Sequence, residues 1–276
     1  MIVFRSCSGF DELEACVRLQ IEVWGYNEGD VIPRRAFLVG QKIGGQVIGA
    51  FDTEVPGSPA EGGPDSLVGF ALSLPGVKTG EGIPRAYLHS HMLAVKEGYR
   101  NRGLGSKLKL EQRKEALSRG IRHMEWTFDP LEIKNAFLNI HKLGAIVCGY
   151  RVNFYGVSSS RLQGGLPTDR LLAEWELDSP RVLAILDSQG AAGQVAEERV
   201  QVRIQVPASI YEWKASDSER DRALAVQMEN RSRFQEAFSQ GLAVLGFVRD
   251  AEGNGVFELG IPTRAEMVTD TKERTY

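Results

Sequence analysis

The stretch with the clearest chemical potential is RNRGLGS, residues 100–106, which follows an apolar strand and opens a predicted helix. The first N–H groups of a helix have no partner inside the helix and lie at the positive end of its dipole. Gly103 and Gly105 remove side chains that would keep an anion away from those groups. Arg100 and Arg102 place positive charge beside them. The stretch therefore predicts a site for a phosphate or pyrophosphate group.

Two common nucleotide-binding loops do not fit this stretch. A Walker loop is excluded because no G-x-x-x-x-G-K-[ST] occurs in the chain. A dinucleotide-binding G-x-G-x-x-G is excluded because Leu108 stands where the third glycine would be. An ordinary strand–turn–helix with two turn glycines remains the alternative interpretation.

A pair of histidines, His89 and His91, is the second candidate for chemistry. They lie two apart on the strand before residues 100–106, so both side chains are expected on one face, together with Leu93 and Val95. Imidazole, with an ordinary pKa near ~6.5, can accept the proton that an ammonium group must lose before it acts as a nucleophile. Partly buried structural histidines and a metal-ligand pair are the alternatives. No third ligand has suitable spacing, so no metal site is predicted.

The combination R-x-x-G-x-G, directly after a strand that ends in Leu-Ala-Val, resembles the acetyl-CoA signature of the GNAT superfamily. The resemblance extends over roughly residues 2–155 in the order of strands and helices, and residues 200–276 lie outside it. It implies that the pyrophosphate of CoA lies on the N–H groups of residues 102–106. It also implies that the pantetheine arm pairs with residues 93–95, in a gap between strands 86–95 and 121–128.

The family's pantetheine-binding asparagine is displaced in this chain, and Asn135 and Asn139, one helical turn apart, are its candidates. The residues expected to bind the cofactor are Leu93, Ala94, Val95, Arg100, Asn101, Arg102, Gly103, Leu104, Gly105, Ser106 and Asn135.

The segment H-x-H-x-L-A-V also resembles arylalkylamine N-acetyltransferases, in which two histidines relay a proton from the amine through water. By this resemblance His91 and His89 are the expected catalytic residues. Many GNAT enzymes have a tyrosine three residues before a helix-ending Leu-Gly, where it protonates the leaving thiolate. Ile140 occupies that position here. Tyr150 and Tyr155 are possible substitutes, or the thiolate leaves without an acid.

The acceptor amine is expected at the connection between the first two helices, WGYNEGDVIPRR, residues 24–35. Aromatic side chains there could line a pocket, acidic ones could bind an ammonium group, and arginines could pair with a carboxylate. The candidates are Trp24, Tyr26, Glu28, Asp30, Arg34 and Arg35.

Alternating strands and helices must position these residues. Strands are predicted at 2–5, 46–51, 67–74, 86–95, 121–128 and 145–152, and helices at 10–24, 34–43, 103–120 and 129–144, the last with Asp129 as its N-cap. Residues 200–206, 216–240, 242–248 and 255–259 add a strand, a helix and two strands. The fold class is α/β (α+β): a GNAT-like mixed central sheet flanked by helices, with a C-terminal α/β accessory subdomain.

The predicted domains are 1–185, which binds acyl-CoA and carries the catalytic residues, and 200–276, the accessory subdomain. The segment DSQGAAGQVAEER, residues 187–199, is small, polar and glycine-bearing, and it is the predicted linker.

Composition limits the partners. The chain has 276 residues with a formal net charge of −3 and 42% hydrophobic residues, so it can bury a core and lacks the basic surplus typical of nucleic-acid binding. The three cysteines are scattered and include no C-x-x-C pair, which suggests free thiols in a reducing compartment. No apolar stretch approaches the ~20 residues needed to span a bilayer, and no signal peptide is apparent. A cytoplasmic protein without nucleic-acid or membrane partners is expected, and a homodimer is compatible with the sequence.

The predicted activity is N-acyl transfer from acetyl-CoA, or a larger acyl-CoA such as succinyl-CoA, to the amine of a small molecule such as an amino acid. Direct attack with histidine-assisted deprotonation is the expected mechanism. A non-catalytic acyl-CoA-binding sensor or scaffold is the alternative, and a metal-dependent hydrolase built on the histidine pair is a third interpretation.

Overall fold

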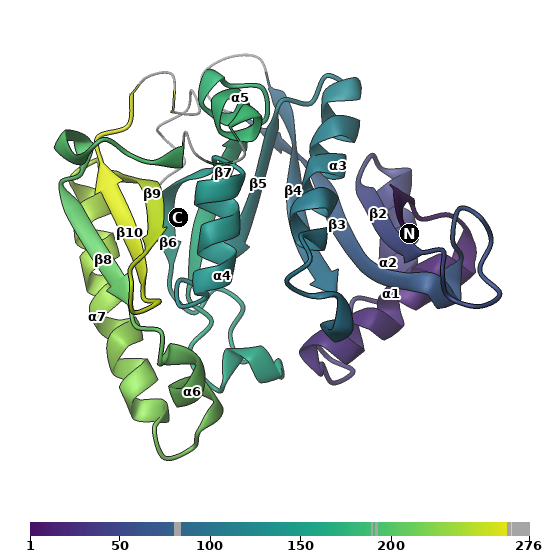
Figure 1. The fold of residues 1–276 in the computed structure, drawn as a ribbon, viewed down its shortest axis with the longest axis horizontal. Coiled ribbons are helices and arrows are strands. Elements are labelled where there is room, and N and C mark those ends of the chain that lie inside the picture. The colour runs from purple at the N-terminus through teal and green to yellow at the C-terminus, as the bar shows by residue number, and fades with distance from the viewer. Residues whose placement is uncertain (80–83, 189, 191–192, 264–265, 267–276) are drawn as a thin grey trace. The chain divides into compact units, whose positions relative to one another are not determined.

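The computed structural model describes residues 1–79, 84–188, 190, 193–263 and 266, which form two compact units (Figure 1). Unit 1 comprises Met1–Lys78, Pro84–Met124 and Ser159–Arg161. Unit 2 comprises the described residues of Thr79–Ile83, Glu125–Ser158 and Leu162–Tyr276.

Unit 1 is an antiparallel sheet of four consecutive strands with three α-helices. The strands are β1 (Ile2–Ser6), β2 (Gln46–Asp52), β3 (Leu67–Lys78) and β4 (Arg85–Val95), and each pairs with the next along the chain. The helices are α1 (Gly9–Trp24), α2 (Arg34–Lys42) and α3 (Leu104–Ser118), with short 3₁₀ turns η1 (Pro64–Ser66) and η2 (Glu97–Tyr99).

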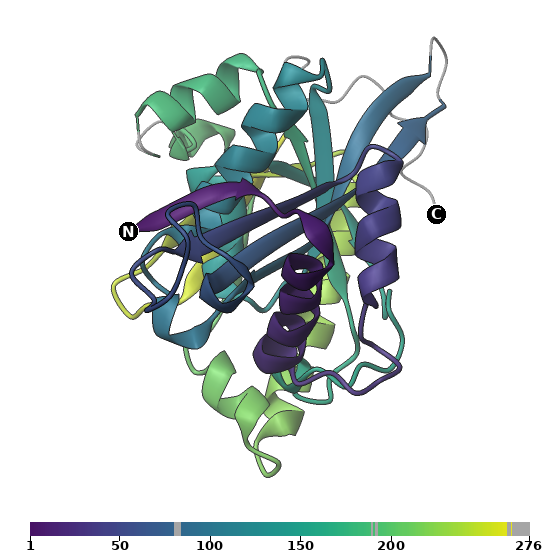
Figure 2. The ribbon, with the colours of Figure 1, turned by 90° about the vertical axis from the view of Figure 1, so that its right-hand side faces the viewer.

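The sheet of unit 1 has helices on both faces, because alternate strand side chains point to opposite sides. On one face Phe51, Phe70 and Met92 are buried in a cluster with residues of α1 and α2. On the other face, residues of β2–β4 pack against Leu104 and Leu108 of α3. Figures 1 and 2 show α1 and α2 together on one side of these strands, with α3 on the other.

Unit 2 is built on the strand order β5-β7-β6-β9-β10-β8. The strands are β5 (His123–Phe128), whose first two residues belong to unit 1, β6 (Ile146–Arg151), β7 (Arg170–Glu176), β8 (Val202–Val206), β9 (Ala243–Arg249) and β10 (Gly255–Gly260). Among its described residues the helices are α4 (Ile133–Ala136), the π-helix η3 (Phe137–Lys142), α5 (Pro180–Asp187), α6 (Ile210–Ala215) and α7 (Arg220–Ser239). The 3₁₀ turns are η4 (Arg161–Gln163), whose first residue belongs to unit 1, and η6 (Glu197–Arg199). α7 packs on β6 and β8, and η3 packs on β9.

A buried carboxylate connects the elements of unit 2. Asp169, at the end of the segment before β7, is fully buried and accepts a hydrogen bond from the hydroxyl of Tyr150 at 2.6 Å. The guanidinium of Arg231 on α7 contacts both of its oxygens, at 2.8 and 3.0 Å. The backbone N–H of Asn153, a non-glycine residue with φ of 45°, also donates to Asp169, at 2.9 Å. One side chain thereby joins β6, β7 and α7.

The predicted fold class, a central sheet flanked by helices, is confirmed. Most predicted elements are present, but β7 and α5 were missed, since no strand or helix was predicted between residues 152 and 200. β3 and β4 are longer than predicted: Pro75–Lys78, beyond the strand predicted at 67–74, pair with Arg85–Leu88. The two-domain division stays a prediction, and residues 189, 191–192, 264–265 and 267–276 of the linker and second domain lie outside the described residues. β9 pairs with β6 at Val147 and Val244, so strands on both sides of 187–199 share a sheet.

The predicted N-cap role of Asp129 is wrong. The helix begins at Ile133 with Glu132 as its N-cap. The carboxylate of Asp129 instead accepts the N–H of Leu131 at 2.8 Å and the Nζ of Lys214 at 2.9 Å. Lys214 is 6% exposed and also contacts Glu132 at 3.0 Å. The carboxylate of Asp129, predicted to cap the helix, thus forms a tertiary ion pair instead.

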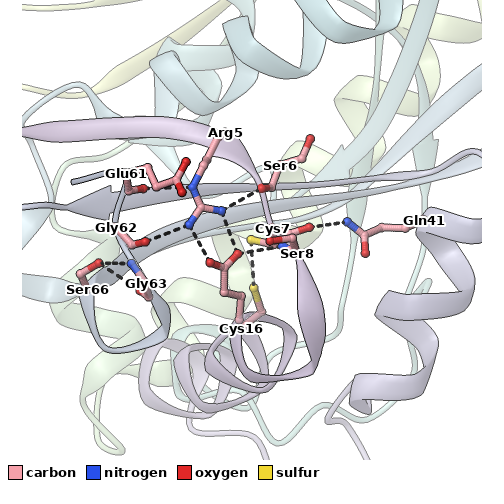
Figure 3. Close-up of polar contacts among 11 residues, drawn as sticks. Arg5, Ser6, Cys7, Ser8, Cys16, Gln41, Glu61, Gly62, Gly63 and Ser66 are labelled. Atoms are coloured by element: carbon pink, nitrogen blue, oxygen red, sulfur yellow. Dashed lines mark hydrogen bonds and ion pairs between the residues drawn. The ribbon is translucent and has the colours of Figure 1, made fainter. Parts of the chain in front are cut away.

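In unit 1, an arginine of β1 forms an ion pair with a glutamate of α1 (Figure 3). The guanidinium of Arg5 donates to both carboxylate oxygens of Glu12, at 2.8 and 2.6 Å, and lies 3.9 Å from the ring centroid of Phe51. It also donates to the carbonyl oxygens of Glu61 and Gly62, at 3.0 and 3.1 Å. β1, α1 and the segment before η1 therefore share one charged group.

Replacing Glu12 with glutamine should destabilise the protein. Burial raises the pKa of Glu12, but hydrogen bonds from Arg5 and the N–H of Ser8 outweigh this and hold the pKa below its ordinary value of 4.5. A carboxyl group with a lowered pKa contributes stability above its unfolded pKa, and that stability is lost as the pH falls through the folded pKa. We expect Glu12→Gln to cost about 1–3 kcal/mol at pH 7.

The measurement is urea unfolding at several pH values between neutral and acid. Glu12→Gln should also flatten the fall in stability below pH 4.5, because the variant has no carboxyl group there to protonate. Glu14→Gln is the matched control, since Glu14 lies on the same helix and has only a half-exposed contact with Arg34 at 3.3 Å. Equal losses in the two variants would contradict the role given to Glu12.

Candidate active site

Residues 100–106, between η2 and the first turn of α3, form the loop that is predicted to bind an anion, and this loop is called the cradle below. Asn101 and Gly103 have φ angles of 61° and 78°, and α3 begins at Leu104 with Gly103 as its N-cap. The N–H of Lys107 donates to the carbonyl oxygen of Gly103 at 3.1 Å. Among the described residues, no protein acceptor lies on the N–H groups of residues 104–106. These groups are the unpaired donors that a helix start presents to an anion.

Side chains hold this loop in place. The Nε of Arg100 donates to the carbonyl oxygen of Val95 at 3.1 Å, which connects the loop to the end of β4. The hydroxyl of Tyr99 donates to the carboxylate of Asp52 at 2.7 Å, and the guanidinium of Arg102 lies 5.3 Å from the Tyr99 ring centroid. Both arginines are exposed, as an electrostatic role toward a solvent-borne phosphate requires.

The strand before the loop contains an irregularity at His91. Leu93, Ala94 and Val95 pair with Ala71, Phe70 and Gly69 of β3, and Met92 pairs with Leu72. The next pair is Ser90 with Ser73, so His91 has no partner on β3. β4 therefore has one more residue than β3 at this point, which is a β-bulge. Bulges redirect side chains and are over-represented beside active sites.

The bulge corrects the predicted direction of the histidines. Ser90 contacts α3, as do Leu93 and Val95. His89, next to Ser90, must point to the opposite face, where Met92 is buried against α1 and α2. The rings of His89 and His91 have centroids 6.1 Å apart, so the two histidines lie together. They share a face, as predicted, but the prediction that Leu93 and Val95 lie on it is wrong, because the extra residue reverses the alternation.

The surroundings of His91 favour its neutral form. The ring is half-buried, and burial, followed by the nearby charge of His89, lowers the pKa of His91 from its ordinary value of 6.5. A neutral imidazole at pH 7 can accept a proton, which is what a general base must do.

The remaining expected residues of the acyl-transfer site lie in unit 2. Ile140 is fully buried, in keeping with a core position. The hydroxyl of Tyr150 is committed to Asp169, and burial together with that contact raises the pKa of Tyr150 far above its ordinary value. Tyr155 is 44% exposed and its hydroxyl lies 2.9 Å from the Oγ1 of Thr127 on β5. Of the two asparagines, Asn135 is exposed and Asn139 is 3% exposed.

The connection between α1 and α2 contains the expected acceptor residues. The rings of Trp24 and Tyr26 stack with centroids 5.5 Å apart and an interplanar angle of 15°. The carboxylate of Asp30 accepts the N–H and hydroxyl of Ser159, at 2.7 and 2.6 Å, and these bonds lower the pKa of Asp30. Glu28 is exposed. The aromatic pair is partly buried against the core of unit 1, Glu28 is exposed, and Asp30 has a structural partner.

Two further positions of this connection are arginines. Both are exposed, but Arg34 donates to Glu14 at 3.3 Å and lies 5.3 Å from the ring centroid of Phe10. Arg35 is therefore the better placed of the two to meet a carboxylate.

Sequence reasoning missed a buried lysine beside this site. Lys109 of α3 is 2% exposed and donates to Ser90, the residue before His91, at 2.7 Å. The signal was present in the helix spacing. Leu104, Leu108 and Ala116 form the buried stripe of α3, and Lys109 and Gln112 fall on the same stripe, where polar residues are unusual. Across the described residues, no group of three or more His, Cys, Asp or Glu side chains is arranged to hold a metal ion.

Comparisons with known proteins bear on the family and the fold. Residues 22–139 match the model of the acetyltransferase (GNAT) family. The fold resembles that of Arabidopsis thaliana NAA60 in complex with a bisubstrate analogue, with a TM-score of 0.51 and 18% identity over 63% of this chain and 97% of that one. The acetyl-CoA complex of the same protein gives a TM-score of 0.51 and 16% identity over 63% and 98%.

The ribosomal-protein-S18-alanine N-acetyltransferase of Escherichia coli gives a TM-score of 0.47 and 15% identity over 64% of this chain and 94% of that one. No curated protein matches the sequence.

Within the described ranges, no helix has both the length and the apolar character needed to cross a membrane.

By this family match, residues 22–139 carry a GNAT acetyltransferase domain, and the shared fold agrees with it. The protein is an acyl-CoA-dependent N-acyltransferase.

Substituting Gly103 tests the cradle. A Cβ at Gly103 would meet nothing within 4 Å, but the φ of 78° is unfavourable for any other residue. We expect Gly103→Ala to cost about 1–2 kcal/mol of stability and to weaken CoA binding, because relief of the strain moves the N–H groups of the first helical turn. Isothermal titration with CoA measures the second effect.

Gly98→Ala is the matched control. Gly98 lies in η2, five residues before Gly103, and a Cβ there also meets nothing within 4 Å, but its φ is not positive. The control should bind CoA like the wild type. Wild-type affinity in Gly103→Ala would contradict the assignment of the loop.

Proposed function

We propose that this enzyme binds acyl-CoA on residues 100–106 and transfers the acyl group to the amine of a small molecule such as an amino acid. The carrying observation is the helix start at Leu104, where the N–H groups of residues 104–106 have no acceptor among the described residues and two exposed arginines lie nearby. A pyrophosphate needs this combination of donors and charge.

The family match supports acetyl-CoA or another acyl-CoA as the co-substrate. The Arabidopsis thaliana NAA60 structure in complex with acetyl-CoA, which shares the fold, is in accord with this. In the proposed complex the backbone of residues 93–95 binds the pantetheine arm. The cradle recognises pyrophosphate, so the donor can carry acetyl or a larger group such as succinyl.

The proposed chemistry is direct acyl transfer. The amine nitrogen attacks the thioester carbonyl, the new C–N bond forms, and the C–S bond breaks with departure of the CoA thiolate. Backbone N–H groups near Leu93 polarise the carbonyl oxygen. His91, with His89 beside it, takes the proton that the amine loses, directly or through water. The lowered pKa of His91 supports this role because the base is neutral at pH 7.

The general acid is the part of the mechanism with fewest candidates. Ile140 replaces the usual tyrosine, and the hydroxyl of Tyr150 is engaged with a buried carboxylate. Of the two tyrosines Tyr155 is the more accessible, with 44% of it exposed, although its hydroxyl contacts Thr127. A thiolate can also leave unprotonated, so the reaction does not require this group.

The proposed acceptor site uses the connection between α1 and α2. The stacked Trp24 and Tyr26 offer a flat apolar surface, Glu28 can bind an ammonium group, and Arg35 can bind a carboxylate. This combination suits an amino acid. An N-terminal peptide amine presents related groups, so peptides form the competing acceptor class.

Two measurements test the proposed function. Thermal unfolding with acetyl-CoA, succinyl-CoA, CoA and NAD should show stabilisation by CoA species alone, by about 2.7 kcal/mol at 100 times the Kd. Thiol release from acyl-CoA should then depend on the amine in a panel of amino acids, small amines and short peptides. Binding of CoA without turnover of any amine would favour the sensor alternative, and turnover of peptides alone would overturn the small-molecule assignment.

The pH dependence of turnover should report on His91. With a pKa below 6.5, the base is neutral above that pH, so kcat/KM should rise with pH below 6.5 and level off before pH 7. His91→Gln should lower the plateau by roughly 100-fold and abolish this rise. The acceptor should be an amine that stays neutral over the range, so that its own titration does not contribute.

His141→Gln is the control, because His141 lies in unit 2, stacked on Phe137 at 4.5 Å, and has no place in the proposed mechanism. It should keep both the plateau and the rise. An unchanged profile in His91→Gln would remove His91 from the mechanism.

A further inference from the structure

A group of buried polar side chains lies between α3 and the sheet of unit 1. Lys109, Gln112 and Ser90 are 2%, 0% and 5% exposed. The Nζ of Lys109 donates to the Oγ of Ser90 at 2.7 Å, and this hydroxyl donates to the Oε1 of Gln112 at 3.0 Å. Lysine is almost never buried unless a specific contact compensates for the loss of water. The position therefore calls for an explanation beyond packing.

The polar group extends to two more strands. The Nε2 of Gln46, on β2, donates to the backbone oxygen of Gln112 at 2.9 Å. The Oγ of Ser73, on β3, donates to the Oε1 of Gln46 at 2.8 Å. Gln46 and Ser73 are 3% and 0% exposed. Four hydrogen bonds thus connect Lys109 of α3 with β4, β2 and β3 in turn.

The group reaches the sheet at the site of the bulge. Ser90 and Ser73 are partners across the β3–β4 ladder, and the next pair is Met92 with Leu72, with His91 unpaired between them. Both members of the pair that precedes the bulge are therefore bound to the polar group. Because a one-residue change of register reverses every side chain of a strand, holding Ser90 toward α3 fixes the extra residue at His91.

We propose that Lys109 is a positioning residue: through its hydrogen bond to Ser90 it fixes the bulge at His91 and thereby the orientation of the histidine pair. This inference rests on the proposed function for its effect on turnover, but not for its effect on the histidine rings. Burial holds the pKa of Lys109 well below its ordinary value of 10.5. This agrees with an amine that acts through a hydrogen bond and not as a surface charge.

The test replaces Lys109 with methionine, which has similar length and no hydrogen-bonding group. We expect kcat to fall at least about tenfold, since small misplacements of catalytic groups have effects of this order. The Kd for CoA, measured by titration calorimetry, should stay within about twofold because the cradle N–H groups are not part of the polar group. Lys114→Met is the matched control, as Lys114 lies on the same helix with its side chain 78% exposed, and it should change neither quantity.

Ser90→Ala provides a second variant, which removes this hydrogen bond together with the one from Ser90 to Gln112, and it decides the matter if Lys109→Met does not fold. The double variant should lose little more kcat than Ser90→Ala alone, because both substitutions remove the Lys109–Ser90 hydrogen bond. A purely structural lysine would instead lower stability in Lys109→Met and leave kcat unchanged in the folded fraction, which would overturn the proposal.

A readout independent of turnover is the ¹⁵N–¹H spectrum of the histidine rings. Lys109→Met and Ser90→Ala should shift the His91 and His89 signals and leave those of His141 unchanged. Unmoved His91 signals in the folded variants would also overturn the proposal. If the wild type turns over no amine, the proposed function fails, and the ring signals alone then confirm or overturn the positioning role.

Discussion

β3 and β4 pair over ten residue pairs, and within that length β4 has one residue more than β3. A sheet can accommodate such a surplus only by leaving a residue unpaired, and the unpaired residue is His91. The arrangement on either side follows from this constraint. Residues after the bulge keep Leu93 and Val95 against α3, and residues before it turn Ser90 toward α3 and His89 away. The two histidines then lie side by side on the face opposite the helix that begins at the anion cradle.

In unit 2, buried ion pairs and hydrogen bonds connect many short elements. Asp169 binds Tyr150, Arg231 and the backbone of Asn153, and Lys214 binds Asp129 and Glu132. Removing one partner of such a pair leaves an uncompensated buried charge, which is far more costly than the pair is stabilising. These contacts commit Tyr150 and Asp129 to structural roles. They explain why two residues with plausible chemical or capping roles in the sequence are not available for them.

The sequence was sufficient where local physics decides the outcome. The glycines at 103 and 105 and the preceding apolar strand predicted the helix start at α3, and the structure has Gly103 in the left-handed conformation there. The strand and helix order of unit 1 follows from hydrophobic periodicity. Three features could not be predicted this way. The bulge depends on which residues of β3 pair with β4. The carboxylate of Asp129 is bound by a lysine 85 positions later in the chain, and β7 lies in a segment of mixed polar and apolar character. Each is set by a tertiary partner, which no local pattern encodes.

Helix α3 begins at the cradle and contains Lys109 five positions after its first residue. A helix advances about 1.5 Å and turns about 100° per residue, so these two points are separated by about 7.5 Å along a rigid rod. Inserting or deleting one residue between Leu104 and Lys109 would rotate the lysine away from the sheet, even if every side chain at the cradle were retained. The number of residues between the glycines and the buried lysine therefore cannot change without moving the lysine. A chimaera that exchanges only the cradle must keep this number.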